Sequence, residues 1–320
     1  MKILFTFDIK DKYVESLYES FADIEIVKSE DMDVLQKEIK DADILAAMLM
    51  RKFDSELIEL GNNLKWIQSW SAGVDRFLKE DLFEYIKKNN ITLTSVRGIH
   101  RDSMAEQVLG YLISFSRRFP ELFELQKNRE WERLKVDYLK DKTLAVFGLG
   151  AVGKEVARKA SVFKMNVVGI KRNTDVDIPY VNEIYSPKQK NEVLNKADYV
   201  VTTLPLTDQT RGYFGREEFA AMQSSACFIN VARGEIVKQD QLVKALQNKS
   251  IAGAALDVFE EEPLPQDSPL YDLDNVILTP HISGLFPHYN REAVKVFKNN
   301  LRLFIEGEKL VNVIDPERQY

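Results

Sequence analysis

The chain has 320 residues, of which 45% are hydrophobic and 29% are charged. This length predicts two domains, and the composition is that of an ordinary globular protein, which excludes a disordered or fibrous chain. The formal net charge is −6, and the lysines and arginines are interspersed among acids. The charge therefore argues against a nucleic acid or an anionic membrane as a partner.

The sequence has no pattern of a secretion signal or of a membrane span. Residues 1–10 contain Asp8 and only a short apolar run, and the longest apolar run covers residues 44–50, which is too short to cross a bilayer. The single cysteine, Cys227, lies in the apolar stretch 226–231, which excludes an intrachain disulfide and favours a core position over a metal site. We expect a cytoplasmic protein with no bound metal.

Short apolar runs alternate with helical patterns over the first hundred residues. The strands predicted there are residues 3–7, 24–27, 44–48, 64–70 and 91–94. Such alternation is typical of a parallel sheet with helices on its faces. Arg51 follows the third strand, and nothing in the sequence distinguishes it from a surface arginine.

A long helix is expected from Met104 to about Arg117, after the first region. Ser103 and Glu106 have capping-box spacing. The residues that share one helical face are apolar, namely Ala105, Val108, Leu109, Leu112 and Ile113. This helix separates the first α/β region from a second one.

The second region again alternates strands with helical patterns. Its predicted strands are residues 143–147, 167–170, 199–203, 226–231, 251–256 and 276–278, which indicates a second parallel sheet. A closing helix from about His288 to Glu306 has Ala293, Val294, Phe297, Leu301 and Phe304 near one face. Its periodicity does not say which sheet it covers.

A glycine-rich turn joins the strand at 143–147 to the helix that follows it. The turn reads Gly148-Leu149-Gly150-Ala151-Val152-Gly153. The first glycine permits a tight turn, the second lets the backbone approach a pyrophosphate, and the third allows close helix packing. The helix N-terminus adds N–H groups and a positive dipole. A strand before the turn and a helix after it predict a dinucleotide site on a Rossmann-type fold.

The next strand ends in Lys171-Arg172-Asn173. In a site selective for NAD, an acid at this place binds the ribose hydroxyls. Two cations suit the 2′-phosphate of NADP instead, since charge-assisted hydrogen bonds to phosphate are strong. A solvated surface pair is the alternative, and the position favours NADP over NAD.

Three downstream motifs resemble the D-2-hydroxyacid dehydrogenase family in order and spacing. They are Asn230-Val231-Ala232-Arg233-Gly234, then the run from Ala255 through Asp257 and Glu262 to Pro263, then Thr279-Pro280-His281. The likeness extends to 66–75, Ala105-Glu106 and 204–207. It therefore spans most of the chain and points to the NADP-preferring, glyoxylate/hydroxypyruvate reductase-like branch.

The resemblance implies a catalytic set that agrees with the chemistry of these residue types. Reduction of a 2-oxo acid needs a cation for its carboxylate and carbonyl, and an acid that protonates the developing alkoxide. Arg233 matches the cation, His281 the proton donor, and Glu262 the partner that orients the histidine and favours its protonated form. His100 and His288 have no such motif support, although the sequence proximity of His288 to His281 leaves a site role open.

Further positions follow from the resemblance. The loop Ser71-Ala72-Gly73 matches the one that receives the substrate carboxylate on backbone N–H groups, with a structural turn as the alternative. Asp257 matches a residue that binds the nicotinamide carboxamide, with helix capping or a surface role as the alternative. The remaining positions expected to line the cofactor are Thr203, Leu204, Pro205, Val231 and Ala232.

By resemblance, the fold consists of two Rossmann-like or flavodoxin-like α/β domains. Residues 1–98 and 285–320 are expected to form the substrate-binding domain, and 99–284 the inserted dinucleotide domain. The expected enzyme transfers a hydride between NAD(P)H and a small 2-oxo acid to give the D-2-hydroxy acid, as a homodimer. Phosphoglycerate dehydrogenase activity and a cofactor-sensing protein like the transcriptional corepressors of this fold are the alternatives.

Overall fold

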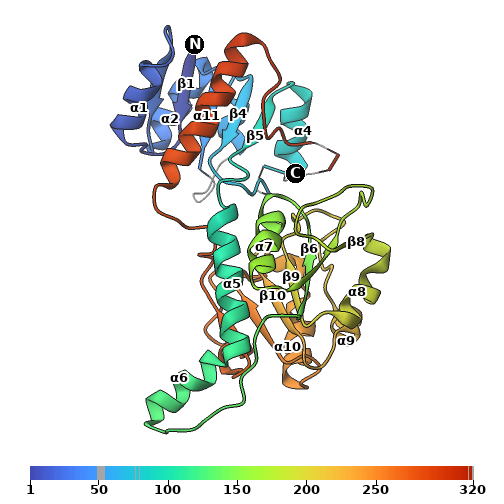
Figure 1. Cartoon of the computed structure of the whole chain (residues 1–320). Coiled ribbons are helices and arrows are strands. Elements are labelled where there is room, and N and C mark those ends of the chain that lie inside the picture. The colour runs from blue at the N-terminus through green and yellow to red at the C-terminus, as the bar shows by residue number, and fades with distance from the viewer. Residues whose placement is uncertain (49–54, 76, 79, 316, 319–320) are drawn as a thin grey trace. The chain divides into compact units, whose positions relative to one another are not determined.

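The structure is a computed structural model that describes residues 1–48, 55–75, 77–78, 80–315 and 317–318. Arg51 lies outside the described residues. The chain divides into two compact units (Figure 1). Unit 1 consists of Met1–Ile99 and Phe286–Tyr320, and unit 2 is the stretch His100–Leu285 inserted between them.

Unit 1 contains a parallel sheet of five strands among its described residues, in the order β2-β1-β3-β4-β5. The strands are β1 (Lys2–Phe5), β2 (Glu25–Lys28), β3 (Ile44–Ala47), β4 (Trp66–Ser69) and β5 (Thr92–Ser95). Its helices are α1 (Asp11–Tyr18), α2 (Met32–Glu38), α3 (Ser55–Glu59), α4 (Glu80–Lys88) and α11 (Tyr289–Glu306). Side chains alternate across a strand, so Ile3 and Phe5 join one core cluster and Leu4 joins the cluster on the other face.

The closing helix α11 covers the sheet of unit 1, which the sequence left undecided. Ala293, Val294, Phe297 and Leu301 are buried in one cluster with Ile3, Phe5 and Trp66 of the sheet. The rings of Trp66 and Phe297 stack with their centroids 5.2 Å apart. The 3.6-residue apolar period of the last helix therefore returns the chain to the first sheet.

Unit 2 is built on a parallel sheet of seven strands in the order β12-β11-β10-β9-β6-β7-β8. The strands are β6 (Thr143–Phe147), β7 (Asn166–Ile170), β8 (Glu183–Tyr185), β9 (Tyr199–Thr202), β10 (Cys227–Asn230), β11 (Gly253–Leu256) and β12 (Val276–Leu278). The helices are α5 (Arg101–Arg117), α6 (Phe119–Asn128), α7 (Ala151–Val162), α8 (Lys190–Lys196), α9 (Arg216–Ala221) and α10 (Gln239–Gln247). The strand order reverses between β6 and β9, the point at which doubly wound folds bind ligands.

The predicted α/β fold with two parallel sheets is confirmed. The sequence patterns did not predict β8. This strand is only three residues long, its residues are exposed or half-buried, and it contains no apolar run. It also placed the start of the long helix wrongly. α5 begins at Arg101, and Ser103 lies inside it with its hydroxyl donating to the carbonyl of His100 at 3.1 Å. The spacing of Ser103 and Glu106 is therefore not a capping box.

Helices α5 and α7 pack on the same face of the unit 2 sheet. Val108 and Leu112 of α5 share a core cluster with Val156 and Ala160 of α7 and with the strand residue Val146. Cys227 is buried in the same cluster, as predicted. Among the described residues, no helix combines the length and the apolar character needed to cross a membrane.

Candidate active site

The residues singled out by the sequence in unit 2 gather where its strands end. Gly148 follows β6, Thr203 follows β9, Arg233 lies after β10, Asp257 follows β11, and His281 lies after β12. All of these strands are parallel. The carboxyl ends of parallel strands lie at one edge of a sheet, so these residues share that edge.

The three glycines of the first turn have three different surroundings. Gly148 has φ +99°, a conformation that side chains disfavour. A Cβ on Gly153 would lie 1.9 Å from the carbonyl oxygen of Gly148, so α7 packs too closely on the turn for any side chain. A Cβ on Gly150 would meet no atom within 4 Å. Gly150 caps α7 and faces open space, which fits a pyrophosphate at the helix N-terminus.

The segment after β9 closes on the glycine turn. Thr203 Oγ1 donates to the carbonyl oxygen of Gly148 at 2.6 Å, and its N–H donates to the carbonyl of Phe147 at 2.8 Å. Leu204 and Pro205 follow, half-buried. These residues line the same sheet edge as the turn, where the sequence places the cofactor.

The cationic segment Lys171-Arg172-Asn173 directly follows β7, the neighbour of β6. Lys171 is half-buried and its N–H donates to the carbonyl of Tyr185 at 2.9 Å, while Arg172 and Asn173 are exposed. The strand order therefore puts both cations next to the strand that ends in the glycine turn.

Arg233 is held by the polar residue that ends β10. Asn230 is 1% exposed; its Nδ2 donates to the carbonyl of Arg233 at 2.9 Å, and its Oδ1 accepts from the N–H of Ala232 at 3.0 Å. The guanidinium donates to the carbonyl of Ala232 at 2.7 Å. Val231 and Ala232 are buried. The backbone that carries Arg233 is thus fixed from both sides by one amide.

The segments that carry Arg233 and Glu262 touch through Gly234. A Cβ on Gly234 would lie 1.9 Å from the backbone carbon and oxygen of Phe259. Only a residue without a side chain permits that approach. Gly234 therefore brings the loop after β10 against the loop after β11.

Glu262 and His281 form a hydrogen-bonded pair. Oε2 of Glu262 lies 2.7 Å from Nδ1 of His281, and Oε1 accepts from the N–H of Phe259 at 3.1 Å. Burial by itself would raise the pKa of Glu262. The hydrogen bonds from His281 and Phe259, with the charges of His281 and Arg233, outweigh burial and lower this pKa. A carboxylate on Nδ1 leaves Nε2 of His281 to face a substrate.

Asp257 is fully buried and its carboxylate is committed to the segment around His281. Oδ1 accepts from Thr279 Oγ1 at 2.5 Å and from the N–H of Ile282 at 2.9 Å, and Oδ2 accepts from the N–H of Ser283 at 2.9 Å. His281 itself has φ +52°, a left-handed conformation that costs a residue other than glycine on the order of 1 kcal/mol.

His100, which no motif indicated, lies beside the predicted cation. Burial and, to a smaller extent, the positive charge of Arg233 together lower the pKa of His100 to about 4. Its ring also lies near Gly284, since a Cβ there would approach Cδ2 of His100 to 3.2 Å. His288, by contrast, is an exposed residue of unit 1 that precedes α11. The position of His100 near Arg233 depends on the fold, since the two residues are far apart in the sequence.

The predicted substrate loop, Ser71-Ala72-Gly73, follows β4 in unit 1. Its three residues are half-buried. The N–H of Ser71 donates to Oγ of Ser69 at 3.2 Å, and the same hydroxyl donates back to the carbonyl of Ser71 at 3.1 Å. The turn is thus braced by a buried serine at the end of its strand.

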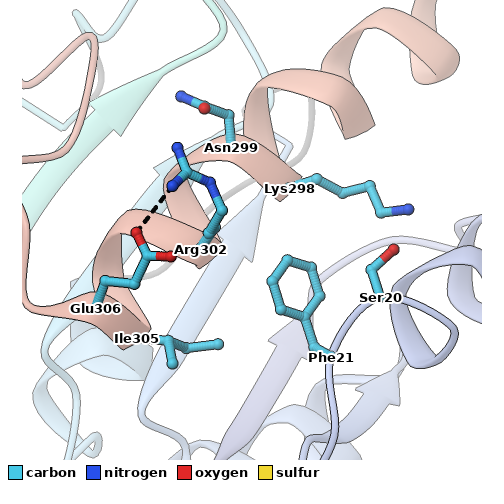
Figure 2. A pocket seen from close by; sticks show the side chains of 7 residues that line it. All are labelled: Ser20, Phe21, Lys298, Asn299, Arg302, Ile305 and Glu306. Atoms are coloured by element: carbon cyan, nitrogen blue, oxygen red, sulfur yellow. Dashed lines mark hydrogen bonds and ion pairs between the residues drawn. The ribbon is translucent and has the colours of Figure 1, made fainter.

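Unit 1 has a surface hollow of about 560 Å³ (Figure 2). None of the site residues described above lines it. Its walls include an ion pair between Arg302 and Glu306 at 2.8 Å. The lining residues are Ser20, Phe21, Lys298, Asn299, Arg302, Ile305 and Glu306. Within the described part of the chain, no group of three or more His, Cys, Asp and Glu side chains is arranged to hold a metal ion.

Known proteins resemble this chain in sequence. A family model described as "D-isomer specific 2-hydroxyacid dehydrogenase, NAD binding domain" matches residues 109–283, more than half of the chain. The glyoxylate reductase of Thermofilum pendens is 32% identical over 314 residues, which cover 94% of this chain and 91% of that protein. The D-3-phosphoglycerate dehydrogenase of Methanocaldococcus jannaschii is 32% identical over 317 residues, 98% of this chain, and the chain spans 59% of that protein's length.

Solved structures resemble it over its whole length. A D-isomer specific 2-hydroxyacid dehydrogenase family protein from Aeromonas salmonicida has a TM-score of 0.87 at 33% identity, with 98% of this chain and 99% of that chain covered. The NADPH-dependent glyoxylate/hydroxypyruvate reductase of Sinorhizobium meliloti, solved with NADP and sulfate, has a TM-score of 0.86 at 26% identity, with 100% and 99% covered. With the glycine turn and the Glu262–His281 pair on one sheet edge, these matches make the chain an NAD(P)-dependent member of the D-isomer specific 2-hydroxyacid dehydrogenase family.

Proposed function

We propose that this enzyme reduces a small 2-oxo acid to the D-2-hydroxy acid with NADPH. The observation that carries the proposal is the 2.7 Å pair of Glu262 and His281, next to Arg233 and on the same sheet edge as the glycine turn. A proton donor and a cation on that edge meet the two needs of carbonyl reduction.

Each residue has a defined task in this reaction. Arg233 binds the substrate carboxylate and polarises the carbonyl oxygen with its planar fork. The nicotinamide dinucleotide, when bound at Gly148–Gly153, supplies the hydride for the carbonyl carbon. His281 gives the proton on Nε2 to the developing alkoxide oxygen, and Glu262 stabilises the protonated ring through Nδ1. The loop Ser71–Gly73 of unit 1 binds the carboxylate through its backbone.

The cofactor assignment rests on Lys171 and Arg172. They follow β7, the strand after the glycine turn, where a 2′-phosphate would lie. No acid occupies the segment Lys171-Arg172-Asn173, and the relative from Sinorhizobium meliloti binds NADP. Asn173, Thr203, Leu204, Pro205, Val231 and Ala232 complete the proposed cofactor site.

Glyoxylate and hydroxypyruvate are the proposed substrates. The relatives from Thermofilum pendens and Sinorhizobium meliloti carry these substrates in their names. Phosphoglycerate dehydrogenase is the second candidate, favoured by the 32% identity to the Methanocaldococcus jannaschii protein.

The test is oxidation of NADPH, followed by absorbance, with a panel of 2-oxo acids that includes glyoxylate, hydroxypyruvate and the 2-oxo product of phosphoglycerate. We expect turnover with glyoxylate or hydroxypyruvate, and a loss of about a hundredfold or more in kcat for His281→Ala with NADPH binding retained. NADPH binding without turnover on any acid would overturn the proposal in favour of a cofactor-sensing protein. Normal turnover by His281→Ala would overturn the assignment of the proton donor.

We also propose a homodimer, because a segment with several exposed apolar side chains projects from unit 2. Figure 1 shows α6 and the chain after it extending away from the sheet of that unit. Trp131 is 98% exposed, and the segment's other exposed apolar residues are Phe119, Phe123, Val136 and Tyr138. Exposed apolar patches of this kind mark interaction surfaces. Sedimentation should give a dimer that Trp131→Glu dissociates, whereas Val162→Glu, at an exposed residue of α7, should not; a monomer would overturn this part.

A further inference from the structure

The carboxylate of Asp257 makes hydrogen bonds to the chain on both sides of His281. It accepts from Thr279 Oγ1 on the preceding side, and from the N–H groups of Ile282 and Ser283 on the following side. The backbone carbonyl of Asp257 accepts from the N–H of His281 itself at 2.8 Å. One residue therefore makes four hydrogen bonds to a five-residue segment that carries the proposed proton donor.

A tyrosine from α5 extends this network. Tyr111 is 3% exposed, and its hydroxyl lies 2.5 Å from Thr279 Oγ1. The hydroxyl of Thr279 has one proton, which it donates to Asp257, so Tyr111 must be the donor to Thr279. Burial, with the charge of Asp257, raises the pKa of Tyr111 and outweighs the hydrogen bonds with Thr279 and Gln107, which lower it. The tyrosine therefore stays protonated, as this direction requires. The order of donation is Tyr111 to Thr279 to Asp257.

The segment needs such a device because its backbone is strained. His281 has φ +52°, a conformation that surroundings must enforce in a residue other than glycine. The His281 side chain is also half-exposed, with 48% of its surface accessible, so side-chain packing does little to fix it. The hydrogen bonds between Asp257 and the backbone around His281 therefore hold the imidazole in position beside Glu262.

We infer that Asp257, Thr279 and Tyr111 are positioning residues for His281, forming a buried chain of hydrogen bonds that fixes the imidazole at the distance where it meets Glu262. This inference rests on the proposed role of His281 as the proton donor. It gives Asp257 a task beyond the predicted contact with the nicotinamide carboxamide, because its fully buried carboxylate already accepts from three donors around His281.

The decisive variants are Thr279→Val and Thr279→Ser. Valine keeps the shape of threonine and removes the hydroxyl, whereas serine keeps the hydroxyl. We expect Thr279→Val to lower kcat about tenfold or more, because small displacements of a reacting group have large effects. The dissociation constant for NADPH should stay unchanged. Thr279→Ser should restore most of kcat. Equal kcat in the two variants and the unaltered chain would overturn the inference.

A double-mutant cycle with His281→Ala separates positioning from general stability. If Thr279 acts through His281, Thr279→Val should have no further effect on kcat in the His281→Ala background. A merely structural role would instead lower the melting temperature and affect kcat equally in both backgrounds, which would overturn the inference. Tyr111→Phe should behave as Thr279→Val with a smaller loss, since it removes only the outer hydrogen bond.

Asp257→Asn tests the two tasks of Asp257 against each other. The amide of asparagine has one oxygen and one NH₂ group, so its NH₂ group would meet the N–H of Ile282 or of Ser283 and one hydrogen bond would be lost. We therefore expect kcat to fall while the affinity for NADPH is retained. A large loss of NADPH affinity with normal kcat at saturation would mean a cofactor contact and overturn the inference for Asp257. Thr279→Val leaves the carboxylate of Asp257 in place. It therefore tests the hydrogen-bond network even if Asp257→Asn does not fold. Failure of His281→Ala to lose activity would overturn the assignment of His281 as the proton donor, whereas loss there with normal kcat in Thr279→Val would overturn only this inference.

Discussion

Nδ1 of His281 lies 2.7 Å from Oε2 of Glu262, although the two residues follow different strands of the unit 2 sheet. β11 and β12 are neighbours in parallel register, with Leu256 opposite Leu278. The loops that leave them therefore begin side by side, and the pair forms across them.

Replacing Glu262 should weaken this pair without disturbing the cofactor. We expect Glu262→Gln to lower kcat about tenfold to a hundredfold, because the imidazole loses the carboxylate that orients it through Nδ1. Steady-state kinetics, with the dissociation constant for NADPH as a second measurement, provide the check. Glu261→Gln, at the exposed neighbour, is the matched control and should behave as the unaltered chain. An unchanged kcat for Glu262→Gln would contradict the importance of the pair.

The second and third glycines of the turn, Gly150 and Gly153, should respond differently to alanine. Gly153→Ala places a Cβ 1.9 Å from the Gly148 carbonyl oxygen, so the melting temperature of the cofactor-free protein should fall. Gly150→Ala meets no atom and should leave that melting temperature almost unchanged. Its methyl group would occupy the place of the pyrophosphate, so the stabilisation by NADPH should be lost. Normal NADPH binding by Gly150→Ala would place the pyrophosphate elsewhere.

Cofactor preference should depend on the cations after β7. We expect the double variant Lys171→Ala with Arg172→Ala to raise the KM for NADPH about tenfold or more, since charge-assisted hydrogen bonds to the 2′-phosphate are lost. The KM for NADH should change little. Lys188→Ala, at an exposed lysine of the same unit, controls for net charge. A higher kcat/KM with NADH than with NADPH in the unaltered chain would refute the preference.

The half-buried His100 should make the protein less stable in acid. Its folded pKa of about 4 lies below the ordinary value of 6.5, first because of burial and then because of Arg233. The unfolded chain therefore binds more protons between these values, and the stability present above pH 6.5 is lost as pH falls toward 4. The difference corresponds to about 3 kcal/mol.

Denaturant unfolding between pH 4 and 7 measures this effect. His100→Gln should flatten the dependence of the free energy of unfolding on pH. His288→Asn is the control, because that side chain is exposed and asparagine tolerates the left-handed backbone there. An unchanged slope for His100→Gln would mean that His100 is not the titrating group.

Much of the fold followed from local patterns. All eleven predicted strands correspond to strands of the structure within a few residues, and the strand at 143–147 matches β6 at both ends. Apolar runs and 3.6-residue periods specify which faces of a segment are buried. The glycine turn was equally recognisable, because the strand before it and the helix after it are local in the sequence. In the structure, Gly148 and Gly153 each have a steric reason to lack a side chain, and Gly150 faces open space.

Tertiary structure alone decided the surroundings of the site. Periodicity predicted an apolar face on α11 but not the sheet that this face covers. No sequence pattern indicated that His100 lies near Arg233, or that the carboxylate of Asp257 binds the backbone of the loop that carries His281. A sequence specifies which side chains are apolar and which need hydrogen-bond partners. The order of the strands determines which distant segment provides those partners, because neighbouring parallel strands bring their carboxyl ends together. For that reason the order of Arg233, Glu262 and His281 along the chain indicated the chemistry, and the fold determined what holds them in place.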